Sequence, residues 1–169
     1  MPSVTTIELF KEEMKFSAGH FTIFSATHRE NLHGHNFTVH VSLHALVEQN
    51  GMAFDYGGCK RKIAELCRAW NEIVLLPERS PHLHLEDAGG YLAATFAGER
   101  MLFLRRDILL LPLENVTLEG LSRLFLEKLL ADPASSAWPG LLGITVKVFS
   151  GPGQCASASW EREPPSLLP

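Results

Sequence analysis

Three histidines near the start of the chain have a spacing that suits a metal site. In the stretch KFSAGHFTIFSATHRENLHGHNFTVHV, His20 ends one alternating segment, and His33 and His35 open the next. Histidines at positions i and i+2 of a strand direct both imidazoles to one face, and we expect Gly34 between them to leave room for a metal. A catalytic zinc takes three protein ligands and keeps a fourth position for water or substrate. The alternative is three partly buried histidines that bond to backbone groups and hold no metal.

The other histidines and the cysteines give weaker signals. His82 and His84 share one face of a short segment and mimic a second site. We expect three further histidines at the surface: His28, His40 and His44. The cysteines are odd in number and show no CxxC spacing, which favours neither a disulfide framework nor a cysteine-rich zinc site. Cys67 fits the apolar face of a helix, and Cys155 is a distant candidate nucleophile without a visible base.

The segments that carry the three histidines alternate as half-buried strands. Residues 5–21 place the apolar side chains from Phe10 to Ala18 on the same parity as His20. Residues 35–48 turn Phe37 and the alternate apolar residues after it inward, a parity that His33 and His35 share. The pattern therefore predicts that all three imidazoles lie on the buried side of their strands.

The rest of the chain supplies two helices and further strands. Helical spacing of apolar residues covers 58–74, and a second helix follows Pro112, with Asn115 or Thr117 as its cap. Turn signals divide 82–106 into a short β-meander, and 143–149 with 155–161 form a closing strand pair. Strands that pair in sequence, with helices between the pairs, indicate an antiparallel α+β sheet with both helices on one face.

Length and composition restrict the class of protein. At 169 residues the chain fits one domain, which we place at 1–163 with a loose tail at 164–169. A net charge of -4 with scattered basic residues argues against nucleic acid or an anionic membrane as partner. No stretch approaches the roughly 18 apolar residues of a membrane span, and the first residues lack a secretory pattern, so we expect a cytoplasmic protein.

Several motifs, taken in order, resemble the 6-pyruvoyltetrahydropterin synthase and 6-carboxytetrahydropterin synthase family. They are FSAGH, LHGHNFTVHV, MAFDYGGCKRKI, LLPERSP and LPLENVTLE, and the similarity runs from about residue 6 to residue 161. The resemblance implies the tunnelling fold, a four-stranded antiparallel sheet with two helices on one face, here with the meander as an insertion. It also implies assembly of copies into trimers or hexamers, with the substrate pocket at a subunit interface.

The resemblance further implies a metal and a class of substrate. His20, His33 and His35 match the zinc ligands of the family, whose substrates are 7,8-dihydroneopterin triphosphate or close relatives. The metal polarises side-chain oxygens of the substrate, which acidifies neighbouring carbon-bound protons and assists triphosphate elimination or carbon–carbon cleavage. Another divalent ion suited to imidazoles is the alternative to zinc.

The catalytic positions depart from the usual family pattern. Where the family carries a cysteine, four or six residues before the first histidine of HGH, this chain has Arg29 and Thr27. A subgroup with glutamate three residues before that histidine is matched by Glu30, a candidate general base. The Asp-His pair of the family aligns with Asn71 and Glu72, so Glu72 is the candidate to replace the histidine in the proton relay.

The substrate positions are only partly kept. Thr117 and Glu119 match one pterin-side motif, while Ser150 stands nearest to the place of the glutamate that holds the pterin in the family. Three readings follow: a zinc-dependent pterin lyase that uses Glu30 and Glu72, the same scaffold acting on a non-pterin substrate, or a metal-binding homologue without catalysis. The first is our prediction.

Overall fold

The computed structural model describes residues 3–48, 50–132 and 138–162 and contains one large sheet, one small sheet and two α-helices. The large sheet follows the order β10-β9-β3-β2-β4-β8, and β1 pairs with β3 beside β2. Its strands are β1 (Ser3–Leu9), β2 (Lys15–His20), β3 (His33–Val47), β4 (Ile73–Pro77), β8 (Ile108–Leu111), β9 (Leu141–Gly151) and β10 (Gln154–Glu161). The predicted tail at 164–169 lies outside the described residues.

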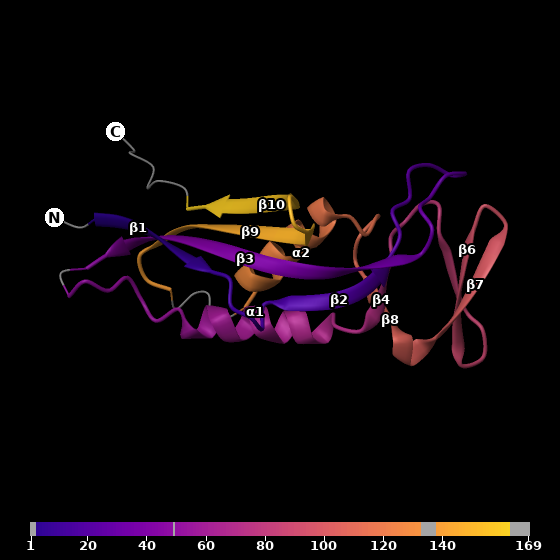
Figure 1. The fold of residues 1–169 in the computed structure, drawn as a ribbon, viewed down its shortest axis with the longest axis horizontal. Helices are drawn as coiled ribbons and strands as arrows, with labels where there is room; N and C mark the ends of the chain where they lie inside the picture. The colour runs from indigo at the N-terminus through magenta and orange to yellow at the C-terminus, as the bar shows by residue number, and fades with distance from the viewer. Residues whose placement is uncertain (1–2, 49, 133–137, 163–169) are drawn as a thin grey trace, which may run out of the picture.

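The α+β architecture is confirmed, and the four strands β2, β3, β9 and β10 pair antiparallel as expected. The helices are α1 (Gly57–Ala69) and α2 (Leu118–Leu130), and both contribute to the core on one side of the sheet (Figure 1). Phe16 of β2 lies at the centre of this core, with ring centroids 4.9 Å from Phe37, 5.6 Å from Trp70 and 6.4 Å from Phe125. The buried aromatic cluster fixes the sheet against both helices.

The predicted single strand at 5–21 is wrong, because a turn at residues 10–14 divides it into β1 and β2. The amide of Met14 donates to the carbonyl of Lys11 at 2.9 Å, and both strands pair with β3 on either side of this turn. The turn changes the parity of the buried residues: Leu9 is buried, whereas Phe10 is 63% exposed. The alternation of apolar and polar residues continues in the sequence through the residues that form the turn. The sequence pattern therefore does not reveal the turn.

The first helix ends earlier than the predicted boundary at residue 74. It ends at Ala69, and the chain turns at Asn71 and Glu72 to continue as β4, which runs parallel to β2. The Asn71 Oδ1 accepts from the amide of Ser17 at 2.8 Å, and the Glu72 amide donates to the Ser17 carbonyl at 2.6 Å. These two bonds tie the turn to β2 and allow the apolar residues after it to pair as a strand.

The start of α2 decides between the two predicted caps. The Thr117 hydroxyl accepts from the Gly120 amide at 3.1 Å, which makes Thr117 the N-cap. Asn115 has another role: its Oδ1 accepts from the Ile23 amide at 3.0 Å, and its Nδ2 donates to the Ile23 carbonyl at 2.8 Å. The side chain of Asn115 thus joins the segment after β2 to the segment before α2.

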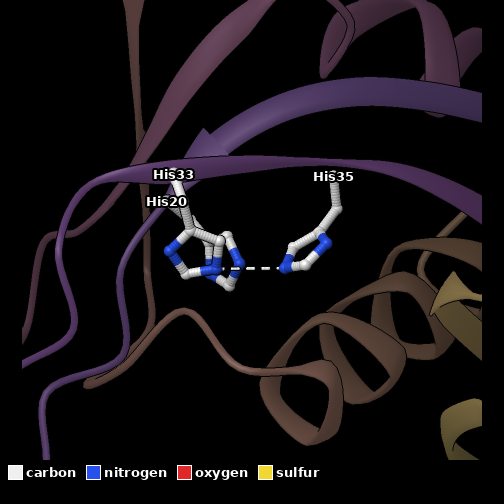
Figure 2. Close-up of side chains that lie close together, drawn as sticks. All are labelled: His20, His33 and His35. Atoms are coloured by element: carbon white, nitrogen blue, oxygen red, sulfur yellow. Dashed lines mark hydrogen bonds between the residues drawn. The ribbon is translucent and has the colours of Figure 1, made fainter.

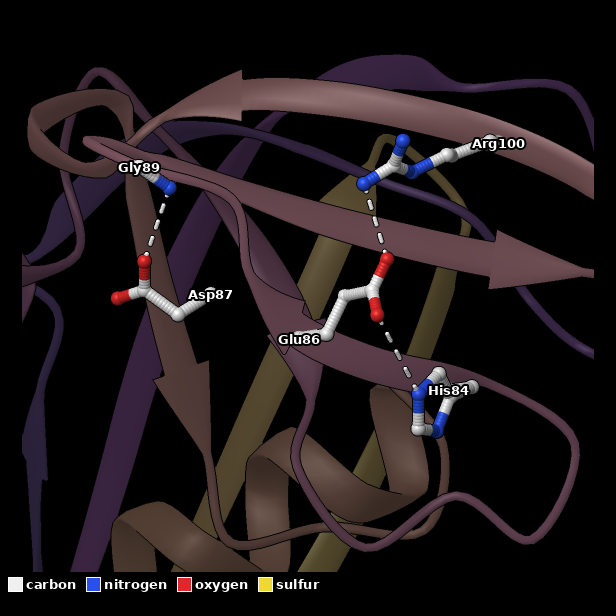
Figure 3. A network of polar contacts seen from close by, with 5 residues as sticks. All are labelled: His84, Glu86, Asp87, Gly89 and Arg100. Atoms are coloured by element: carbon white, nitrogen blue, oxygen red, sulfur yellow. Dashed lines mark hydrogen bonds and ion pairs between the residues drawn. The ribbon is translucent and has the colours of Figure 1, made fainter.

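The predicted meander forms a separate antiparallel sheet of β5 (His84–Asp87), β6 (Tyr91–Phe96) and β7 (Glu99–Leu104), followed by a short 3-10 helix at Arg105–Asp107. It lies at the opposite end of the molecule from β1 (Figure 1). Glu86 pairs with Arg100 at 2.9 Å and lies 3.9 Å from His84, while Asp87 accepts from the Gly89 amide at 3.0 Å (Figure 3). His84 is therefore part of an exposed charge network on the meander.

Among the described residues, no helix is long and apolar enough to cross a membrane. The three cysteines are unpaired; Cys59 and Cys67 are buried and Cys155 is exposed.

Candidate metal centre

The three predicted histidines come together where β2 ends and β3 begins. Antiparallel pairing sets His20 directly opposite His33, and His35 lies two residues further along β3 on the same face. One nitrogen from each imidazole lies within 4.8 Å of the other two. Figure 2 shows the three rings on the same side of the strand pair. The alternation of the two strands is sufficient to produce this convergence.

Backbone carbonyls orient two of the rings. The Nδ1 of His20 lies 2.9 Å from the carbonyl of Val116, and the Nδ1 of His33 lies 2.8 Å from the carbonyl of Asn31. A carbonyl only accepts, so each Nδ1 carries the proton and each Nε2 offers a lone pair. A bond from Nδ1–H to a backbone carbonyl is typical of histidines that bind a metal through Nε2.

The Nε2 atoms fit a shared cation. The Nε2 of His20 is buried and has no hydrogen-bond partner, which is costly in the absence of an electrophile. The Nε2 atoms of His33 and His35 are 3.0 Å apart, and two ligands on a tetrahedral zinc at ~2.0–2.1 Å lie about 3.3 Å from each other. The donor set and its spacing therefore suit zinc or another ion that prefers imidazole.

Burial favours the metal-binding form of His20. Desolvation lowers the pKa of this imidazole, and the nearby His33 and His35 lower it further, against the opposing effects of the Val116 carbonyl and Glu30. The ring is therefore neutral near pH 7, as a ligand must be.

Gly34 does not have the predicted role of leaving room for a metal. Because side chains alternate along β3, Gly34 lies on the opposite face from the two histidines, and a Cβ there would meet the Ala18 carbonyl at 3.4 Å. A larger side chain at position 34 would therefore press on the backbone of β2 and would not reach the space between the imidazoles.

Glu30 lies in the same pocket as the histidines. Its Oε2 accepts from the Thr22 amide at 2.8 Å, and its own amide donates to the Thr22 carbonyl at 2.9 Å. Burial raises the pKa of the Glu30 carboxyl, but the bonds from Thr22 and the charges of His33 and His20 outweigh burial and lower it overall. The side chain is an ionised carboxylate at neutral pH, held beside three imidazoles.

The pocket has a volume of about 420 Å³ and also contains the predicted substrate residues Thr117, Glu119 and Ser150. They come from the start of α2 and the end of β9, so the fold gathers segments that are far apart in the sequence. Sequence reasoning missed Gln154 and placed Cys155 only as a distant candidate, although both line this pocket at the start of β10. The β9–β10 turn that brings them there is visible in the sequence, but the direction in which it faces is not.

Glu72 lies apart from this group. It lines a different cavity of about 450 Å³ with Ser17, Asn36 and Asp107, residues on the other face of the β2–β3 pair or at its edge. Its φ of 57° is a left-handed conformation that costs energy for a residue with a side chain. Within one chain, Glu72 and Glu30 therefore do not share a pocket.

The residues at the family's cysteine positions also lie elsewhere. Thr27 and Arg29 line a third cavity of about 200 Å³ together with Phe96 and Glu99 of the meander.

Comparison with known proteins agrees with the sequence resemblance. A family model described as 6-pyruvoyl tetrahydropterin synthase matches residues 9–159. A Methanocaldococcus jannaschii protein, named provisionally as a 6-carboxy-5,6,7,8-tetrahydropterin synthase, is 24% identical over 146 residues, which are 85% of this chain and 88% of that protein.

Solved structures show the same fold. The 6-pyruvoyl tetrahydropterin synthase of Plasmodium vivax has a TM-score of 0.88 with 22% identity, and that of Plasmodium falciparum a TM-score of 0.88 with 23% identity. Each match covers 95% of this chain and 99% of the other. A further P. vivax structure carries alanine in place of a glutamate that is described as a catalytic residue, with 21% identity and the same TM-score and coverage. The expected tunnelling fold is confirmed.

Proposed function

Because the chain belongs to the 6-pyruvoyl tetrahydropterin synthase family, we propose that it is a zinc-dependent lyase that processes 7,8-dihydroneopterin triphosphate or a close relative. The observation that carries the proposal is the pocket in which three inward imidazoles and an ionised glutamate meet. The two names found among its relatives, 6-pyruvoyl and 6-carboxy tetrahydropterin synthase, support a pterin as the substrate.

His20, His33 and His35 would hold the ion through their Nε2 atoms. When bound, zinc polarises substrate oxygens and lowers the pKa of protons on the adjacent carbon. The bonds from Nδ1 of His20 and His33 to backbone carbonyls keep both rings in the orientation that this binding needs.

Glu30 is the proposed general base. Its carboxylate is ionised at neutral pH and is fixed by the Thr22 amide, so one oxygen lone pair can accept a proton from substrate without prior rearrangement. The glutamate described as a catalytic residue in the P. vivax protein supports this role. No cysteine stands at the family's usual positions, which are Thr27 and Arg29 here.

The substrate would lie along the opposite wall of the pocket. The carboxylate of Glu119 can accept hydrogen bonds from the amino group and ring N–H of a pterin, and the hydroxyls of Thr117 and Ser150 can donate or accept. Where the family resemblance places a second carboxylate, the pocket presents Ser150, and its neighbours Gln154 and Cys155 supply no carboxylate either. We expect this chain to bind the guanidine-like edge of a pterin with fewer charged contacts than its relatives.

The assembly and the location of the protein are also proposals. The path of the large sheet ends at β10 and at β8, and such edges are available for pairing with further copies, as in the trimers or hexamers that the family resemblance implies. A role of Glu72 in the relay requires this assembly, since Glu72 lies outside the Glu30 pocket of its own chain. The free cysteines support a reducing, cytoplasmic location.

The test is incubation of the zinc-loaded protein with 7,8-dihydroneopterin triphosphate, followed by mass spectrometry of the products. We expect turnover by the wild type, a loss of about 10²–10⁴-fold in kcat for Glu30→Gln, and no loss for the exposed control Glu65→Gln. A 6-hydroxymethylpterin product supports Glu30 as the base of a side-chain cleavage. Unchanged substrate with zinc in place refutes the proposed substrate, and full activity of Glu30→Gln refutes the proposed base.

A further inference from the structure

Arg29, the residue before Glu30, is held between two aromatic rings. Its guanidinium carbon lies 5.0 Å from the ring centroid of Phe21 and 5.6 Å from that of Phe96. The side chain is only 14% exposed, and the backbone of Arg29 is bridged to Ile23. Cation–π contacts at a desolvated site of this kind are stronger than at an exposed one. The guanidinium therefore has a fixed place although it belongs to a loop.

The two rings come from different parts of the fold. Phe21 follows His20 directly at the end of β2, and Phe96 is the last residue of β6 in the meander. After Phe96 the chain turns through two residues with positive φ, Ala97 at 48° and Gly98 at 85°. Arg29 thus adds a charged side chain to the contact between the meander and the loop between β2 and β3, where Phe21 and Ile23 of the loop already pack against Leu92, Ala94 and Phe96 of the meander.

Arg29 also bonds directly to Glu30. Its Nη1 donates to the Glu30 carbonyl at 2.7 Å, and its Nη2 lies 3.4 Å from Oε2 of Glu99 at the start of β7. Together with the two bonds between Glu30 and Thr22, the amide, carbonyl and carboxylate of Glu30 all have partners. The bond from Arg29 Nη1 therefore joins the Glu30 carbonyl to a side chain that contacts the meander.

The burial of Arg29 between the two rings is energetically unfavourable for one of its polar groups. The Nε of Arg29 is buried without a hydrogen-bond partner, and Glu99, its partner in the ion pair, is largely exposed. An exposed partner at 3.4 Å contributes little to stability. A hydrophobic residue between the two rings would avoid this unsatisfied donor, but it would not donate to the Glu30 carbonyl.

We propose that Arg29 is the positioning residue for Glu30 and that the β6–β7 hairpin acts on the reaction through it. The inference rests on the proposed function for the role of Glu30, but the contacts themselves do not depend on it. Arg29 does not line the pocket with the histidines, so it acts on Glu30 and not on substrate or metal. The meander thereby becomes part of the machinery that holds the base in place.

The first test measures, in the absence of substrate, how well the hydrogen bonds between Glu30 and Thr22 are protected from exchange. Arg29→Ala should speed hydrogen exchange at the amides of Thr22 and Glu30 at least tenfold, while zinc stoichiometry and exchange in the core of β3 stay unchanged. Phe96→Ala, which leaves Arg29 present but removes one ring, should speed exchange at the same two amides. The exposed control Arg106→Ala should leave both amides as in the wild type. Unchanged exchange in Arg29→Ala overturns the proposal.

The second test measures catalysis. We expect Arg29→Ala to lower kcat by about 10–100-fold while KM stays within about twofold, because the loss of Arg29 displaces the base and removes no contact to the substrate. Arg29→Lys is less prone to unfold than the alanine variant. It should also lower kcat and leave KM nearly unchanged, since an ammonium does not reproduce a stacked planar guanidinium. In the background of Glu30→Gln, Arg29→Ala should cause no further loss, because residues that act as one unit are not additive.

The outcomes separate the two proposals. An additive loss in the double variant, or a rise in KM with kcat unchanged, refutes the positioning of Glu30 by Arg29. If the wild type leaves the pterin unchanged, the proposed function fails, and the exchange experiment alone decides whether Arg29 orders Glu30.

Discussion

Removal of one imidazole from the histidine cluster should abolish stabilisation of the protein by zinc. A ligand that binds only the folded state stabilises it by RT ln(1 + [L]/Kd), which is about 2.7 kcal/mol at a free zinc concentration of 100 times Kd. For a chain of this length, 1 kcal/mol shifts the melting temperature by about 2–4 °C, so zinc should raise it by roughly 5–11 °C. The effect depends on all three imidazoles, because their ligand nitrogens lie within 4.8 Å of one another and form the group that can hold one ion.

The assay is differential scanning fluorimetry of metal-free protein titrated with buffered zinc, with elemental analysis for stoichiometry. His33→Ala should lose the shift and retain less than one equivalent of zinc after desalting. His84→Ala is the matched control, because His84 is exposed on the meander, lies 3.9 Å from Glu86 and does not belong to the histidine cluster. Stoichiometric zinc in His33→Ala, or loss of the shift in His84→Ala, would refute the ligand assignment.

Two further changes test the fold and the pocket. Asn115→Ala removes both hydrogen bonds to the backbone of Ile23 and should lower the free energy of unfolding in urea by about 1–3 kcal/mol. Asn115→Asp keeps the acceptor for the Ile23 amide but sets a second oxygen against the Ile23 carbonyl, so it should also be less stable than the wild type; equal urea midpoints for all three proteins would contradict the role of these bonds. In the native protein, a thiol reagent at pH 8 should label Cys155, which is exposed, but not the two buried cysteines, because burial raises the pKa of each to about 12 and keeps the thiols protonated. Mass spectrometry of peptides identifies the labelled site, and labelling of a buried cysteine without unfolding would contradict the prediction.

The sequence by itself determined which side chains of β2 and β3 face the core and which three histidines form the candidate metal centre. Alternation with a period of two residues places His33 and His35 on one face, and the buried parity of β2 adds His20. Antiparallel pairing of neighbouring strands then brings the three rings together without any long-range information. The apolar faces of the two helices and the three strands of the meander were likewise visible, because each depends on residues close in sequence, whereas the structure decided between Asn115 and Thr117 as the cap of α2.

Only the tertiary structure decided which of the other candidates share a pocket. Glu30 lies beside the histidines and Glu72 does not, because the turn at Asn71 bonds to β2 and sends the chain into β4 along the other edge. Sequence patterns describe one face of one element and do not say which elements surround a site.

The same limit explains the roles of Arg29 and Cys155. Arg29 follows no periodic pattern, yet the meander supplies a ring that fixes its guanidinium and joins it to Glu30. Cys155 enters the pocket because β10 folds back on β9 at the turn after Gly151. Contacts between segments separated by tens of residues depend on the packing of the whole chain. For this reason the histidine cluster could be predicted from the sequence, while its surroundings could not.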